Sequence, residues 1–89
     1  YVAKAQNYFS NSKVAEFKVE TTQLSVGDEI IIAGPTTGVI ETTVKEIRVN
    51  LQPVQTALKG QICSIPIEEK VRRADKLYRL VDATELKKS

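Results

Sequence analysis

Apolar and polar residues alternate along several segments of the 89-residue chain, which is the period-two pattern of strands with one buried face. The alternation is regular over residues 14–19 and 61–67 and less regular over residues 1–9. The polar cluster at residues 10–13 separates the first two segments along the chain and predicts a β-hairpin. Pro66 has no N–H to donate to a neighbouring strand, so it marks an end or an edge of its segment.

The stretch Leu24–Gly38 contains a turn, a strongly apolar strand and a second turn. Gly27 and Asp28 predict the first turn, because glycine adopts positive φ and aspartate can bond its own backbone. The three consecutive isoleucines at 30–32 are β-branched and predict a strand over residues 29–33. Because this run lacks alternation, we expect it to be buried on both faces or to twist within a small barrel.

The second half of the chain is less regular. Residues 39–49 are long for one strand, and their apolar residues change parity midway, which is typical of a β-bulge or a sharp bend. Residues 50–60 contain Pro53 and predict a loop or a single turn. A turn at residues 74–75, similar to the Gly-Asp turn upstream, precedes a last strand over residues 76–81.

About six short strands without a helical pattern predict an all-β fold, either a small barrel or a sandwich. We expect a closed antiparallel β-barrel, because long bent strands occur where one strand serves two parts of a closed sheet. A chain of 89 residues allows one domain. Residues 1–81 are predicted to form this barrel, and residues 82–89 a polar C-terminal tail.

Composition adds information mainly on the setting of the chain. The net charge of +2 neither demands nor excludes an anionic partner. No apolar run approaches the ~18 residues of a membrane helix, so we expect no membrane contact. Cys63 is the single cysteine, whereas small secreted domains usually carry several, so we expect a cytoplasmic location. The chain begins at Tyr1 and contains no methionine, so we expect it to be part of a longer protein.

The residues that usually carry catalysis are scarce. The chain has no histidine, which is the commonest general base and the commonest metal ligand. The adjacent carboxylates at 28–29 and 68–69 point to opposite faces of a strand and do not form an acid–base pair. Cys63 is predicted to pack as a small apolar residue. We therefore expect no catalytic residue, no metal site and no cofactor in this chain.

One segment concentrates positive charge, and its candidate binding residues are Lys70, Arg72, Arg73 and Lys76. Neighbouring acidic residues dilute this charge, so the segment can be a solvated loop that keeps the domain soluble. The alternative is contact with nucleic-acid phosphates or with an acidic partner surface, since the planar guanidinium bonds phosphate through two donors at once. Both interpretations remain open.

The sequence Gly34-Pro-Thr-Thr-Gly38 shares two glycines with phosphate-binding loops. It lacks the Gly-Lys-Ser/Thr ending of such loops, and no helical pattern follows it. It therefore predicts a hairpin turn whose threonine hydroxyls bond the turn backbone, with a weak binding role as the alternative.

The order of these features resembles the second-domain barrel of translation elongation factor Tu, over most of residues 1–81. The residues that carry this resemblance are Leu24-x-Val26-Gly27-Asp28-x-Ile30-x-Ile32-x-Gly34, Val44-x-x-Ile47, Ala57-x-x-Gly60 and Asp75-x-Leu77. A closer resemblance is to the C-terminal barrel of the collagenase-like peptidase family U32. Its residues are Val14-Ala15-Glu16, Val26-Gly27-Asp28-Glu29-Ile30, Gly34-Pro35-Thr36-Thr37-Gly38 and Val71-Arg72-Arg73-x-Asp75-Lys76-Leu77-Tyr78.

The U32 resemblance implies a separate catalytic domain that precedes this one in the same parent chain and is its partner. It implies that the parent is a peptidase or, as in other relatives, an enzyme that takes part in hydroxylation of RNA bases. The present chain is then a non-catalytic accessory barrel that positions a protein or RNA substrate or holds domains together. The translation-factor resemblance implies an alternative, an RNA-binding barrel. The oligomeric state is not implied by either resemblance.

Overall fold

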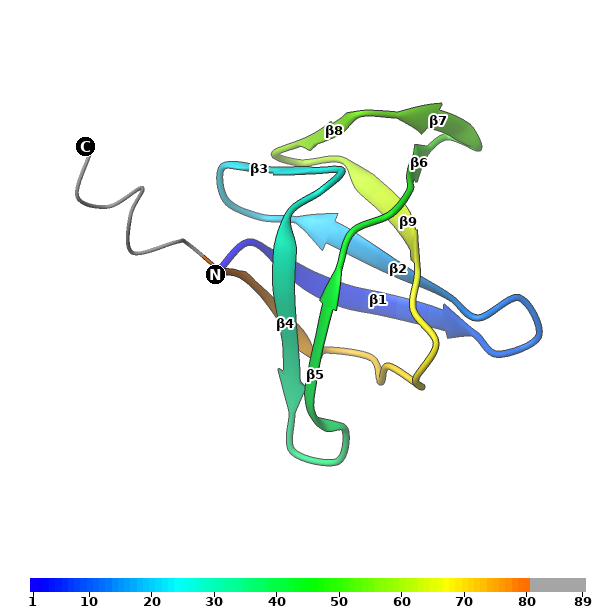
Figure 1. Cartoon of the computed structure of the whole chain (residues 1–89), viewed down its shortest axis with the longest axis vertical. Helices are drawn as coiled ribbons and strands as arrows, with labels where there is room; N and C mark the ends of the chain where they lie inside the picture. Colours follow the sequence, from blue (N-terminus) through cyan, green and yellow to red (C-terminus); the bar gives the residue numbers. More distant parts are fainter. Residues whose placement is uncertain (81–89) are drawn as a thin grey trace.

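The computed structural model describes residues 1–80, and the predicted tail at 82–89 lies outside them. The described residues form ten β-strands and no helix, so the predicted all-β class is confirmed (Figure 1). The strands are β1 (Ala3–Phe9), β2 (Val14–Val19), β3 (Gln23–Ser25), β4 (Glu29–Gly34), β5 (Gly38–Thr43), β6 (Ile47–Val49), β7 (Gln52–Val54), β8 (Thr56–Leu58), β9 (Ile62–Pro66) and β10 (Lys76–Arg79).

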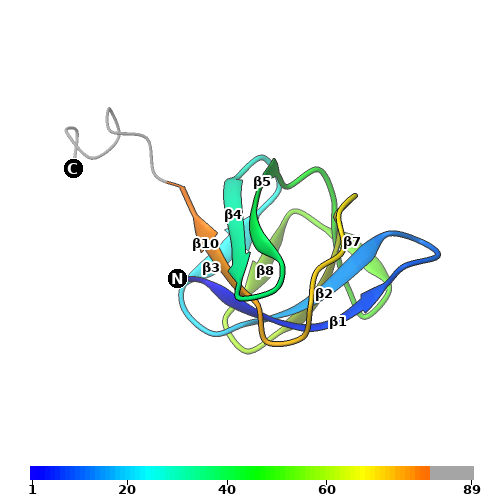
Figure 2. The same cartoon turned by 90° about the horizontal axis from the view of Figure 1, so that it is seen from below.

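Eight strands form one antiparallel sheet in the order β5-β4-β10-β1-β2-β9-β6-β7, and β3 pairs separately with β8. The sheet rolls up around the core, so that its strands are seen in a ring from below (Figure 2). The predicted N-terminal hairpin is confirmed as the β1–β2 pair. Among the described residues the ladder leaves β5 and β7 as its two edges, so a barrel closed by continuous hydrogen bonding is not observed.

The alternation seen in the sequence sorts side chains between the core and the outer face. Phe17 on β2 and Cys63 on β9 are fully buried, as expected. In the isoleucine run, Ile30 and Ile32 are fully buried whereas Ile31 is only half-buried. Of the two alternatives predicted for this run, burial on both faces was wrong, because the single curved sheet encloses one core and Ile31 lies on its outer face.

Two irregular segments also differ from prediction. Residues 39–49 do not form one bent strand: β5 ends at Thr43, and β6 begins at Ile47. Residues 50–60 contain the strands β7 and β8, which were predicted as a loop. The β6–β7 hairpin turns through Asn50 and Leu51, both at positive φ (52° and 65°), which is a conformation usually marked in sequence by Asn-Gly. With leucine in the second position, that marker is missing.

Three turns share one construction, in which a side-chain oxygen accepts from the backbone N–H three residues before it. Asp28 accepts from Ser25 N at 2.9 Å, and Asp75 accepts from Arg72 N at 2.9 Å. Gln61 accepts from Leu58 N at 2.8 Å in the same way. In each turn the residue before the acceptor has positive φ, and these residues are Gly27 (95°), Ala74 (75°) and Gly60 (91°).

The second of these turns is locked to the tip of the β4–β5 hairpin. Gly34 pairs with Gly38, so the predicted hairpin turn is confirmed. The Thr37 hydroxyl donates to Asp75 Oδ2, and the buried carboxyl group packs against the Cα of Gly34 so closely that a Cβ there would overlap Oδ1. The expected bond from Thr37 thus goes to a distant side chain, not to its own turn.

Candidate functional site

Three lysines stand side by side on the outer face of the sheet. The register places Lys4 of β1 directly opposite both Lys18 of β2 and Lys76 of β10. All three are exposed, because each alternates along its strand with buried residues. Directly opposed side chains in an antiparallel pair have Cβ atoms about 5 Å apart, and like charges there destabilise the sheet. The described residues form no ion pair with these lysines.

Two of the predicted basic residues belong to a neighbouring site. Arg72 and Arg73 line a cavity of about 200 Å³ together with Pro35 and Thr36 of the β4–β5 turn. The turn at 72–75 reaches β1 through two backbone bonds, Ala5 N to Asp75 O at 2.8 Å and Ala74 N to Ala5 O at 2.9 Å. The two arginines therefore project from the loop that leads directly into Lys76 and the lysine row.

The structure thus divides the four predicted residues. Arg72 and Arg73 share a cavity, Lys76 joins the lysine row, and Lys70 is exposed outside the strands and lines neither feature. Sequence reasoning missed Lys4 and Lys18. Each looks like an ordinary outward-facing residue of an alternating strand, and only the register of three strands brings them together.

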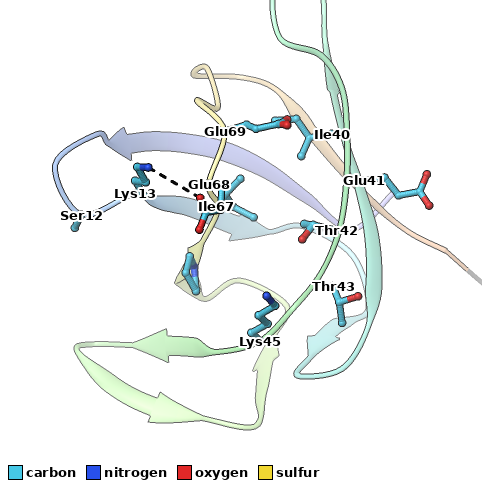
Figure 3. A pocket seen from close by; sticks show the side chains of 11 residues that line it. Ser12, Lys13, Ile40, Glu41, Thr42, Thr43, Lys45, Ile67, Glu68 and Glu69 are labelled. Atoms are coloured by element: carbon cyan, nitrogen blue, oxygen red, sulfur yellow. Dashed lines mark ion pairs between the residues drawn. The ribbon is translucent and has the colours of Figure 1, made fainter.

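A groove lies along β5, one of the two edge strands of the sheet. It has a volume of about 330 Å³ and runs between β5 and the segment that follows β9 (Figure 3). Lys13 and Glu68 form an exposed ion pair at its far wall, with 4.0 Å between Nζ and Oε2. Its lining residues are Ser12, Lys13, Ile40, Glu41, Thr42, Thr43, Lys45, Pro66, Ile67, Glu68 and Glu69.

The titratable side chains do not form a reactive centre. Burial raises the pKa of the Cys63 thiol to about 11, so it stays protonated near neutral pH and is a poor nucleophile. Partial burial, followed by the hydrogen bond to Glu20, raises the pKa of Tyr1 to about 12. Within residues 1–80 no group of three or more His, Cys, Asp or Glu is placed to hold a metal ion. No helix in that range is long and apolar enough to cross a membrane.

Comparison with known proteins places this architecture. No family model matches the chain. A collagenase of Porphyromonas gingivalis is 60% identical over 79 residues, which are 89% of this chain and 22% of the collagenase. An uncharacterized protease of Methanocaldococcus jannaschii is 33% identical over 79 residues, which are 19% of its length. The solved C-terminal domain of a Geobacillus thermoleovorans U32 peptidase-type protein has the same fold, with a TM-score of 0.85, 13% identity, and coverage of 91% of this chain and 92% of that domain.

The fold is therefore that of the C-terminal domain of a U32 peptidase-type protein. The resemblance to the C-terminal barrel of the collagenase-like peptidase family U32 that was inferred from the sequence is confirmed. The chain spans about a fifth of the length of the curated relatives that it matches.

Proposed function

We propose that this chain is a non-catalytic accessory domain that holds a polypeptide substrate for the catalytic part of a larger collagenase-like peptidase. The observation that carries the proposal is the 60% identity to a collagenase in which the matched residues make up only 22% of the length. Most of that relative lies outside the matched part, and a catalytic domain has ample room there.

The chemistry of the chain supports an accessory role. It has no histidine, and its single cysteine is buried with a raised pKa. Asp75, the one buried carboxyl group among the described residues, already accepts bonds from Thr37 and Arg72. A binding domain needs surface and shape, and the open groove along β5 supplies both.

The test is an assay of the 89-residue chain alone on fluorescein-labelled gelatin. We expect retention of gelatin on the immobilised domain and no release of fluorescent fragments at neutral pH. Fragment release by the purified chain, abolished when one of its own residues is replaced, would make it an autonomous hydrolase and overturn the proposal.

A second candidate function is binding of single-stranded RNA, favoured by the lysine row. Lys4, Lys18 and Lys76 present three charges across three strands, and Arg72 and Arg73 lie in the loop beside them. Spacing of this kind suits a phosphate backbone, whose binding is governed by release of counterions. In that case the parent is an RNA-modifying enzyme, and the similarity to the translation-factor barrel inferred from the sequence includes RNA binding.

The RNA candidate predicts a salt-dependent affinity for a short single-stranded RNA. Replacing Lys4 and Lys76 together by glutamine reduces the slope of log K against log salt by about 1.4, at about 0.7 for each phosphate that is no longer neutralised. The matched control is Lys45→Gln, which removes an exposed charge at the groove and leaves the slope unchanged. An unchanged slope in the double variant contradicts the RNA candidate.

We also propose a cytoplasmic location for the parent protein. The support is the single buried cysteine, since a small exported domain usually gains stability from disulfides. Cell fractionation of the source organism tests this location, and recovery in the exported fraction contradicts it.

A further inference from the structure

The outer edge of β5 carries backbone N–H and C=O groups that do not pair with another described strand. Val44 N donates to Asp28 O at 2.9 Å and Val44 O accepts from Gly27 N at 2.8 Å, so the peptide groups of Val44 face β4. Peptide groups of successive residues point to opposite sides of a strand. Those of Thr43 and Glu41 therefore point away from β4, toward the groove side. In the described part of the chain no strand pairs with this edge.

The other open positions of the sheet carry a proline. Pro53 lies in the middle of β7, the opposite edge strand, and Pro66 ends β9 on the far side of the groove. Proline cannot donate to a ladder and is one of the devices that protect an edge from pairing. The segment 38–45 has no proline, and Val39 within it is 70% exposed. The sheet is thus protected at two places and left able to pair at β5.

A groove lies beside this edge. It has a volume of about 330 Å³, follows β5 from Ile40 to Lys45 and is bounded on its other side by residues 66–69 (Figure 3). A strand added to β5 would lie about 4.8 Å from it, on the groove side.

Charge indicates which chain the groove accepts. Glu41 extends away from the wall formed by Ile67, Glu68 and Glu69 (Figure 3). It would therefore lie beside an outward-facing side chain of an added strand, where a basic residue is favoured over an acidic one. Ile40 and Ile67 also line the groove, but both are buried in the core.

We propose that β5 binds an extended segment of the polypeptide substrate as an added antiparallel strand that fills the opening between β5 and β9. Main-chain bonds to Glu41 and Thr43 supply the affinity, and the Glu41 carboxylate favours a segment with a basic side chain. This inference rests on the proposed accessory function and names the kind of substrate feature that it recognises: an unfolded, extended stretch with free N–H groups.

The test uses the 89-residue chain and the peptide acetyl-Lys-Val-Thr-Val-Thr-Lys-amide. Titration followed by amide NMR is expected to slow hydrogen exchange at Val39, Glu41 and Thr43 by about tenfold or more, because these amides become bonded. Thr42, which already faces β4, is the internal reference. A peptide N-methylated at every residue has no backbone N–H donor along its strand and is expected not to bind.

The matched variants are Glu41→Pro and Glu41→Gln. Proline at 41 removes an outward donor without breaking a bond to β4, so the fold is retained while peptide affinity falls about tenfold or more. Glutamine keeps the donor and removes only the charge, so it is expected to weaken binding less. If Glu41→Pro unfolds the chain, comparing the binding of the N-methylated and unmethylated peptides to the wild-type chain still tests the proposal.

Three results overturn the proposal: binding without slower exchange at the β5 amides, equal binding of the N-methylated peptide, and a dimer of the free chain that Glu41→Pro dissociates. The last would assign the edge to a second copy. The accessory function has a separate test in the parent protein. If the 89-residue chain does not bind the peptide but the parent protein still requires this domain for gelatin cleavage, strand addition at β5 is refuted and the accessory function is not.

Discussion

Asp75 links two loops that are far apart in the sequence, and its removal is the most informative single perturbation of the fold. The residue is 3% exposed. Oδ2 accepts from Arg72 N at 2.9 Å and from the Thr37 hydroxyl, and Oδ1 lies against Gly34. The Asp75→Ala change therefore frees the turn before β10 and the tip of the β4–β5 hairpin at once.

The magnitude follows from the two bonds. A hydrogen bond to a charged group contributes about 1.5–3 kcal/mol, and a buried donor left without a partner adds to the loss. We expect Asp75→Ala to lower the free energy of unfolding by about 3 kcal/mol or more, and Tm by about 12 °C or more. Asp28→Ala is the matched control: Asp28 makes the same turn with one bond, to Ser25, and is expected to cost about half as much.

Urea unfolding of the 89-residue chain measures these differences, provided that the m-value is unchanged. Asp75→Asn separates charge from hydrogen bonding, since one amide oxygen can accept both bonds now made to Oδ2. We expect it to cost less than Asp75→Ala. A loss below about 1 kcal/mol for Asp75→Ala, or a loss no larger than that of Asp28→Ala, would refute the role given to this carboxyl group.

Three further outcomes are expected. Gly34→Ala is expected to destabilise the chain by about 2 kcal/mol or more, because its Cβ overlaps Asp75. Most of this loss is expected to disappear in the Asp75→Ala background, and additive losses in a double-mutant cycle measured by urea unfolding contradict that contact. The folded-state pKa of Cys63 is raised from 9.0 to about 11, so its contribution to stability is present below pH 9 and is lost as pH rises toward 11. Urea unfolding is expected to show that the wild type loses stability relative to Cys63→Val over that window, and a constant difference between the two contradicts the raised pKa. Lys4→Gln relieves repulsion from Lys18 and Lys76, so it is expected to raise the free energy of unfolding at low salt by about 0.5 kcal/mol. This gain disappears at high salt, and a loss of stability at low salt contradicts the repulsion among the three lysines.

The class of fold was readable from the sequence because alternation reports which face of a strand is buried. Phe17 and Cys63 behave as their pattern predicted, and Gly38, with φ of 78°, turns the chain where its glycine indicated. Short strands were not readable. β7 follows a turn at Asn50 and Leu51 that carries no glycine, and three-residue strands contain too few residues for a pattern.

The candidate sites depend on which strands are neighbours in the sheet and on their register. The sequence of a single segment does not reveal either when the paired strands are distant in the chain. Lys76 was predicted as part of a basic run, but its partners Lys4 and Lys18 come from other strands through the register of the sheet. The open edge at β5 is a property of the whole sheet order. Pro53 and Pro66 were visible in the sequence, but their role as protected positions appears only once the edges are known.

The central claim is that this domain serves a catalytic domain elsewhere in the parent protein by holding an extended polypeptide. The most direct measurement compares the full-length parent with a form that lacks residues 1–89, on gelatin and on a short fluorogenic peptide. We expect kcat/KM for gelatin to fall about tenfold or more while the value for the short peptide is unchanged, because binding remote from the reacting bond is removed. Equal activity of both forms on gelatin would contradict the claim.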